Sequence, residues 1–292
     1  MKGQRRLMEK FELYKNNDLR IQGYSWPASD PVCVMCIIHG VGEHAGRYDR
    51  MAGMLNEKGI AVLSMDLRGH GETSGKRGHC APRKSVLADV DRLIRRAEAD
   101  YPGLPIVLYG HSMGGNIGLD YVNRGNLNSV PAGFIISAPW IRLVRPVPAP
   151  LYGALKLLSK IAPTFQINTN VDEGILGNKE SVGNYADDPL VHTKLSVISA
   201  VQAFEIGKAL ENGTHENNGG SSGKPLLLMH GGSDRLCSIE GTRNVAKHEA
   251  DRCEYIEWEG LYHEIHNGGA ESNGDEVIEK IGDWIIQLIS KN

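Results

Sequence analysis

Three residues of the sequence have the chemistry of a nucleophile, an acid and a base: Ser112, Asp234 and His263. A serine hydroxyl is a poor nucleophile until a neighbouring histidine takes its proton, and that histidine needs a carboxylate to orient it. Ser112 lies within the sequence GHSMG at positions 110–114, which matches the Gly-x-Ser-x-Gly pattern of nucleophilic serines. Because glycine and serine are common residues, the value of this pattern depends on its surroundings.

The segments around Ser112 favour a strand-to-helix turn. The apolar run 106–109 predicts a strand that leads into the pattern, and apolar residues at helical spacing over 112–123 predict a helix that leaves it. Such a turn places the serine hydroxyl at a helix N-terminus, where the helix dipole favours developing negative charge. The alternative interpretation is a serine that only caps the helix within a tight turn.

The acid and the base are expected in loops beyond the ends of strands. His263 follows the predicted strand 253–258 and a short turn, and Asp234 follows the predicted strand 225–230 in the same way. His266 is the main alternative base, and we interpret His230, at a strand end, as structural. Less well placed candidates are His192, His215 and His248 for the base, and Asp187, Asp188 and Asp251 for the acid.

An oxyanion needs two backbone N–H groups to stabilise it. We expect one from Met113, directly after the nucleophile, and the other from Val41 in the loop HGVGEH at 39–44. The small neighbours of Val41 would let its backbone approach a substrate. The alternative is a turn in which the glycines serve only the local conformation.

Strands and helices alternate over most of the chain. Strands are expected at 12–14, 20–26, 33–38, 60–65, 106–109, 132–137, 225–230 and 253–258, and helices at 48–58, 86–100, 112–123, 239–248 and 275–289. Continuous apolar runs such as 33–38 are typical of strands buried on both faces. The predicted fold class is therefore α/β, with a mainly parallel central sheet flanked by helices.

The alternation stops after residue 138. From 139 to 210 there is no clear strand, and prolines interrupt apolar helical stretches such as 151–161. We therefore predict an inserted helical cap over 139–210, and a core formed by 1–138 and 211–292. Glycine, serine and asparagine at 211–224 predict a flexible surface loop.

The overall composition is that of an ordinary globular protein. The 292 residues are 41% hydrophobic and 23% charged, with a net charge of −3, which gives no support for nucleic acid as a partner. We expect no metal and no cofactor, since Cys33 and Cys36 lie inside an apolar run without a zinc-type ligand set. The basic first residues lack the apolar core of a secretion signal, so we expect a cytoplasmic protein.

Several segments together resemble the monoacylglycerol lipase family and the related bacterial lysophospholipases. The most specific are HGVGEHAGRY at 39–48, DLRGHGETSGKRG at 66–78, YGHSMGG at 109–115, GGSDRLC at 231–237 and YHEIHN at 262–267, with NYADDPLV at 184–191 in the cap. The resemblance covers nearly the whole chain and implies an α/β-hydrolase fold. It implies the same triad of Ser112, Asp234 and His263, and the same oxyanion donors. The long polar stretch 211–224 departs from the family.

The resemblance also implies how a substrate is held. Glu43, Arg47 and Tyr185 match family positions that bind a glycerol headgroup, although Glu43 and Arg47 could instead form a surface ion pair. Cys237 matches a cysteine near the active site, and the apolar cap could shape an acyl tunnel, touch lipid surfaces or merely pack on the core.

The expected function is hydrolysis of a monoacylglycerol to fatty acid and glycerol through an acyl-enzyme on Ser112. A lysophospholipase or a broad carboxylesterase would use the same residues. A binding protein that has the hydrolase fold without activity is an alternative of a different class.

Overall fold

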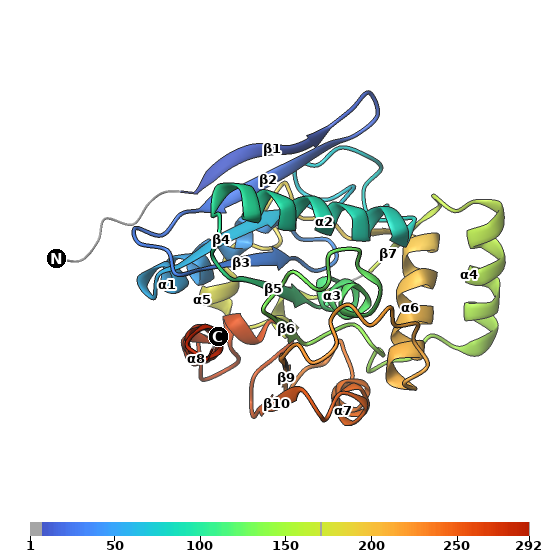
Figure 1. Cartoon of the computed structure of the whole chain (residues 1–292). Helices are drawn as coiled ribbons and strands as arrows, with labels where there is room; N and C mark the ends of the chain where they lie inside the picture. Colours follow the sequence, from blue (N-terminus) through green and yellow to red (C-terminus); the bar gives the residue numbers. More distant parts are fainter. Residues whose placement is uncertain (1–7, 170, 292) are drawn as a thin grey trace.

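An eight-stranded sheet forms the centre of the computed structural model, which describes residues 8–169 and 171–291 (Figure 1). Its strand order is β1-β2-β4-β3-β5-β6-β9-β10. The strands are β1 (Glu9–Lys15), β2 (Arg20–Trp26), β3 (Cys33–Ile38), β4 (Ile60–Met65), β5 (Ile106–His111), β6 (Gly133–Ser137), β9 (Leu226–Gly231) and β10 (Cys253–Trp258). β2 pairs antiparallel with β1 and with β4, and the remaining pairs are parallel. The first seven residues, which entered the prediction about a secretion signal, lie outside the described residues.

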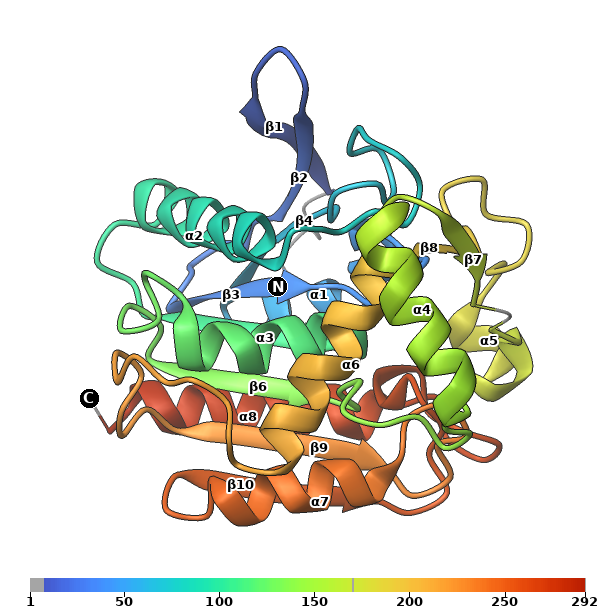
Figure 2. The ribbon, with the colours of Figure 1, turned by 90° about the vertical axis from the view of Figure 1, so that its right-hand side faces the viewer.

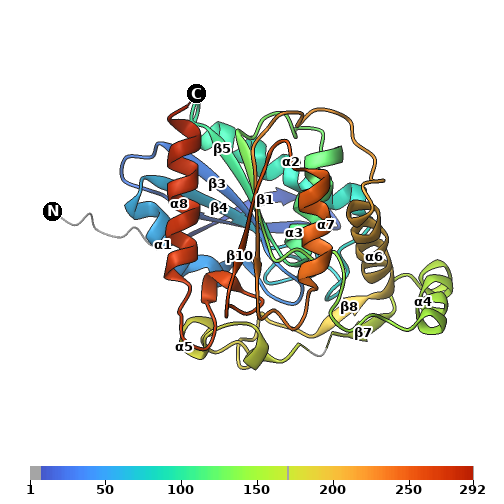
Figure 3. The ribbon, with the colours of Figure 1, turned by 90° about the horizontal axis from the view of Figure 1, so that it is seen from below.

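Helices cover both faces of this sheet (Figure 3). On one face lie α1 (Asp49–Glu57) and α8 (Asp275–Ile289), and on the other lie α2 (Arg83–Asp100), α3 (Met113–Arg124) and α7 (Ile239–His248). The apolar side chains of each set pack with alternate residues of the strands, which accounts for the continuous apolar runs in the sequence. A mainly parallel sheet between two helical layers confirms the predicted fold class.

The two cysteines of the Cys-x-x-Cys sequence lie on opposite faces of the sheet. Cys33 packs with the core beneath α1 and α8, whereas Cys36 packs with the core beneath α2 and α3. Both are free thiols in β3, and burial raises the pKa of Cys33 to about 12. Their positions agree with the interpretation as strand residues.

We call residues 139–210 the inserted segment, which connects β6 to β9. It contains α4 (Ala149–Ile161), β7 (Gln166–Asn168), α5 (Lys179–Val182), β8 (Lys194–Ser196) and α6 (Val197–Glu211). The expectation that it contains no strand is wrong, since β7 and β8 pair antiparallel. Each has three residues, which is too short to produce a visible alternation of polar and apolar side chains. α6 packs between α3 and α4 (Figure 2), and the division into core and cap stays a prediction.

Apart from Glu211, which ends α6, the polar stretch 211–224 is irregular, as expected, and hydrogen bonds attach it to α3. The ring of His215 lies 2.9 Å from the Asp120 carboxylate, and the Ser221 hydroxyl donates to the Val122 carbonyl. Asp120 is fully buried and also accepts two hydrogen bonds from Arg124, while the buried Arg83 guanidinium lies 3.6 Å away. The Asp120 carboxylate therefore connects this loop to α2 and α3.

Asp120→Ala should lower the free energy of unfolding by about 3–5 kcal/mol, because it leaves the Arg83 guanidinium buried without its carboxylate partner. Asp283→Ala is the matched control, since Asp283 forms an ion pair with Lys58 at 59% and 34% side-chain exposure. An exposed pair of this kind contributes less than about 1 kcal/mol. Urea unfolding followed by circular dichroism measures both, and equal losses would contradict the buried role of Asp120.

Candidate active site

The turn between β5 and α3 holds Ser112 in a strained backbone conformation. Its φ is 55° and its ψ is −117°, a region that residues with a side chain rarely adopt. A Cβ on Gly110 would lie 2.4 Å from the Gly114 carbonyl oxygen, and a Cβ on Gly114 would lie 2.1 Å from that of Ile38. Ser112 occupies the N-cap position of α3 but makes no side-chain capping bond. The interpretation as an ordinary cap is therefore wrong.

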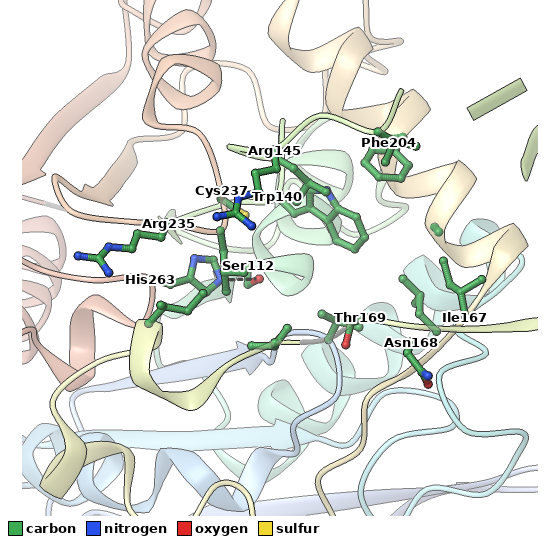
Figure 4. Close-up of a pocket in the computed structure, with 18 of the residues that line it drawn as sticks. Ser112, Trp140, Arg145, Ile167, Asn168, Thr169, Phe204, Arg235, Cys237 and His263 are labelled. Atoms are coloured by element: carbon green, nitrogen blue, oxygen red, sulfur yellow. Dashed lines mark hydrogen bonds between the residues drawn. The ribbon is translucent and has the colours of Figure 1, made fainter. Parts of the chain in front are cut away.

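The hydroxyl of Ser112 instead faces His263 (Figure 4). His263 Nε2 lies 2.9 Å from Ser112 Oγ, and His263 Nδ1 lies 2.7 Å from Asp234 Oδ2. The side chains are buried, with Ser112 7% exposed, His263 3% and the Asp234 side chain 1%. The fold thus brings together three predicted residues that follow β5, β9 and β10, as one chain of hydrogen bonds.

The electrostatics of this chain favour an ionised acid beside a basic histidine. Burial disfavours the charge on Asp234, but His263 and His230 outweigh burial and hold the pKa of Asp234 well below its usual range. Burial also disfavours the charged form of His263, and the Asp234 carboxylate overcomes this and raises the pKa of His263. A carboxylate that stabilises an imidazolium in this way suits a histidine that accepts a proton from Ser112.

The alternative bases and acids lie elsewhere. His266 stacks on Tyr48 with 5.2 Å between ring centroids, and burial lowers its pKa to about 4. His192, His215 and His248 contact the Gly69 carbonyl, Asp120 and the Glu211 carbonyl, respectively. Asp188 pairs with His44, and Asp187 and Asp251 are exposed.

The sequence interpretation missed the contact between His230 and Asp234. His230 Nε2 lies 3.0 Å from Asp234 Oδ2, so the acid has two histidine partners. The only signal in the sequence is the spacing of four residues across the end of β9.

The loop after β3 lies directly against Ser112. A Cβ on Gly40 would come within 3.2 Å of Ser112 Cβ, and Val41 lines the cavity that contains Ser112. Met113 is the first residue of α3, and a first-turn N–H has no acceptor within its own helix. The backbone groups predicted to bind an oxyanion therefore border the Ser112 hydroxyl.

Comparison with known proteins places this site in a family. The family model described as "Serine aminopeptidase, S33" matches residues 29–269. The monoacylglycerol lipase of Mycolicibacterium smegmatis is 31% identical over 264 residues, which cover 89% of this chain and 90% of that protein. The chain belongs to the monoacylglycerol lipase family. Like the family, it is a carboxylic ester hydrolase.

Other relatives agree with this membership. A phospholipase of Bacillus subtilis is 33% identical, over 84% of this chain and 92% of that protein. A longer Dictyostelium discoideum protein with an abhydrolase domain is 31% identical, and the chain spans 27% of its length. The structure of a Saccharomyces cerevisiae monoglyceride lipase with a substrate analog superposes with a TM-score of 0.84 at 23% identity, covering 99% of this chain and 97% of that one. This last likeness supports the α/β-hydrolase fold.

Two cavities meet at Ser112. The larger, of about 560 Å³, has mostly apolar walls and is drawn in Figure 4. Its lining includes Trp140, Leu155, Ile167, Leu195, Phe204 and Cys237, with Arg145, Asn168, Asp172 and Arg235 as polar members. The smaller, of about 30 Å³, lies among Glu43, Tyr185, Leu176 and Glu264.

The predicted headgroup residues form a buried network beside the smaller cavity. Arg47 donates to Glu43 at 2.7 Å and to both carboxylate oxygens of Glu264 at 2.6 and 2.8 Å, and the Tyr185 ring covers its guanidinium at 4.7 Å. Burial raises the pKa of Glu43 despite Arg47, whereas Arg47 holds the pKa of Glu264 well below its usual range. The alternative of a surface ion pair is wrong, because Glu43 and Arg47 have side chains 4% and 8% exposed.

Glu264 is a second residue that the sequence interpretation missed. It follows His263 directly, yet no pattern in the sequence brings it to Arg47, which lies 217 positions earlier. Only the packing of the two loops creates the contact.

The inserted segment binds two loops of the site, the loop after β10 that carries Glu264 and the loop after β3 that carries Gly42. The Glu264 N–H donates to the Leu176 carbonyl at 2.6 Å, and the His192 N–H donates to the Gly42 carbonyl at 2.8 Å. Gly42 has a φ of 78°, and a Cβ there would lie 2.3 Å from the His192 carbonyl oxygen. The backbone of the inserted segment therefore fixes the loop that carries Val41.

Gly42→Ala should reduce ester hydrolysis at least about tenfold, because the added methyl forces His192 and the Val41 loop apart and misplaces an oxyanion donor. Gly183→Ala is the matched control, since Gly183 has a φ of 67° and no atom lies within 4 Å of the position that its added methyl would take. Both substitutions strain the backbone at a positive φ, but only Gly42→Ala also creates a clash with His192. Comparing the turnover of a p-nitrophenyl ester by the two folded variants therefore separates the effect of the clash from that of the strain. Equal activities would contradict the coupling between the inserted segment and this loop.

Proposed function

We propose that this protein hydrolyses the ester bond of monoacylglycerols, with Ser112 as the nucleophile. The observation that carries the proposal is the hydrogen-bonded chain of Ser112, His263 and Asp234 at the junction of a large, mostly apolar cavity and a small one bordered by Glu43, Tyr185 and Glu264. An acyl chain suits the first cavity, and the polar side chains beside the second suit the hydroxyl groups of a glycerol leaving group.

In the proposed reaction, His263 takes the Ser112 proton while Ser112 Oγ attacks the ester carbonyl. The oxyanion accepts hydrogen bonds from the Val41 and Met113 N–H groups. Collapse of the tetrahedral intermediate breaks the bond to glycerol, which leaves with the proton from His263. Water then gives a proton to His263 and attacks the acyl-enzyme. The bond between the acyl carbon and Ser112 Oγ breaks, the fatty acid is released, and His263 returns the proton to Ser112 Oγ. These steps use no metal and no cofactor.

The charges beside the smaller cavity support a neutral alcohol over a phosphate. Glu43 and Glu264 face it, and the single cation among them, Arg47, already binds both carboxylates. A lysophospholipid would bring its phosphate toward two acids whose arginine is engaged, which costs electrostatic energy. This argument favours monoacylglycerol over lysophospholipid as the substrate.

The inserted segment suits contact with a lipid surface, which we propose as part of the function. Its exposed apolar side chains include Leu151 at 53%, Leu157 at 61% and Ile161 at 73%, all on α4. Leu155, on the same helix, lines the larger cavity. Among the described residues, no helix is long and apolar enough to cross a membrane. Peripheral contact through α4, from a cytoplasmic location, is the arrangement we propose.

Ser112→Ala should lower the kcat of a monoacylglycerol or a p-nitrophenyl ester by at least about a thousandfold, because no other group can carry the acyl chain. A fluorophosphonate probe should label the wild-type protein and not the variant. Wild-type turnover by the folded variant would refute the assignment. Absence of labelling in the folded wild-type protein would instead favour a binding protein without activity.

Tyr185→Phe should lower kcat/KM for a monoacylglycerol about tenfold, the effect of losing one hydrogen bond to the glycerol, and leave a p-nitrophenyl ester within twofold. Phenylalanine keeps the ring over Arg47, so the ion network persists. The comparison needs a panel of monoacylglycerols, lysophospholipids and simple esters. Equal losses across the panel, or faster lysophospholipid turnover, would count against the glycerol site.

A further inference from the structure

The Asp234 carboxylate accepts hydrogen bonds on both of its oxygens. Oδ1 lies 2.7 Å from the backbone nitrogen of Leu236 and 3.0 Å from that of Cys237. Oδ2 lies 2.7 Å from His263 Nδ1 and 3.0 Å from His230 Nε2. His263 is required by the proposed reaction, and the two backbone groups belong to the turn after β9. The contact from His230 has no role in the mechanism described above.

The surroundings of His230 determine where its proton lies. Nε2 faces two acceptors, Asp234 Oδ2 at 3.0 Å and the Cys237 carbonyl oxygen at 3.1 Å, so Nε2 must carry a hydrogen. Nδ1 lies 2.8 Å from Thr242 Oγ1, and in the neutral ring it accepts the threonine hydrogen. His230 and Thr242 are both fully buried, so water cannot replace either contact. The ring is thereby held with its Nε2–H toward two acceptors, the Asp234 carboxylate and the Cys237 carbonyl.

We infer that His230 is a positioning residue, which holds the Asp234 carboxylate in the orientation that His263 needs. The inference rests on the proposed triad. Thr242, in α7, supports it by fixing the tautomer of His230. The chain of contacts therefore runs from Thr242 through His230 and Asp234 to His263 and Ser112.

A second consequence concerns the basicity of His263. The His230 N–H neutralises part of the charge on Asp234, and without it the carboxylate would stabilise the His263 imidazolium more strongly. Removing the donor should therefore raise the pKa of His263 further, and the free enzyme would lose its neutral base at a higher pH. The other charged or titratable groups around His263 are His111, His266, Glu43 and Glu264, and a substitution at His230 removes none of them.

The test is the pH profile of kcat/KM for a p-nitrophenyl ester in His230→Leu and His230→Gln. The leucine variant should lose about tenfold in kcat/KM, and its acidic limb should move up by about half a pH unit. Glutamine places an amide N–H near the former Nε2 position and should restore most of both. His70→Leu is the matched control, because His70 is equally buried but contacts the Arg68 carbonyl, and its loss should leave the limb in place.

A folded His230→Leu variant with an unmoved limb and kcat/KM within twofold of wild type would overturn the inference. So would a glutamine variant no better than leucine. If His230→Leu fails to fold, Thr242→Val decides, since it removes only the hydroxyl that fixes the ring, and an unchanged profile would overturn the inference. Asp234→Asn tests the proposed function separately. Wild-type turnover by this variant would refute the triad. If Asp234→Asn loses most of its activity while the His230 variants keep wild-type kcat/KM and pH profile, only the role of His230 is refuted.

Discussion

The backbone strain at Ser112 is the constraint on which the rest of the site depends. A positive φ on a residue with a side chain persists only where its surroundings leave no alternative. Here Gly110 lies against α3, and Gly114 lies against the end of β3, so closely that neither position has room for a side chain. The turn raises the serine hydroxyl above the carboxyl ends of the parallel strands, where the loops after β3, β9 and β10 can reach it. Only that edge of the sheet can therefore supply partners for Ser112.

The second constraint is the burial of several carboxylates around Ser112. A buried acid needs donors or cations, because water no longer stabilises its charge. Asp234 meets this need with two histidines and two backbone N–H groups, and Glu43 and Glu264 meet it by sharing Arg47. The two sets of contacts therefore have different effects on the groups beside them. The first set sustains a basic His263, and the second leaves polar oxygens beside the smaller cavity.

The sequence predicted most of the sheet and all three residues of the hydrogen-bonded chain, because both depend on local patterns. A strand buried on both faces gives a nearly continuous apolar run, as in β3 and β4, and the predicted bounds of β2, β3, β4 and β10 match those in the structure. The missed contacts depend on packing between distant segments. His230 meets Asp234 only through the turn after β9, and Glu264 meets Arg47 only because the inserted segment holds their loops together. The spacing of residues along the sequence does not predict contacts of this kind.

The hydrogen bonds from the inserted segment argue against treating it as a lid independent of the chemistry. Leu176 and His192 bind the loops that carry Glu264 and Gly42, whereas α4 lies outside α6 with exposed apolar side chains. A movement of α4 can change access to the larger cavity without touching those bonds. A movement of residues 176–192 would displace both loops together. Access to the larger cavity and the positions of the loops around Ser112 therefore depend on different parts of one insertion.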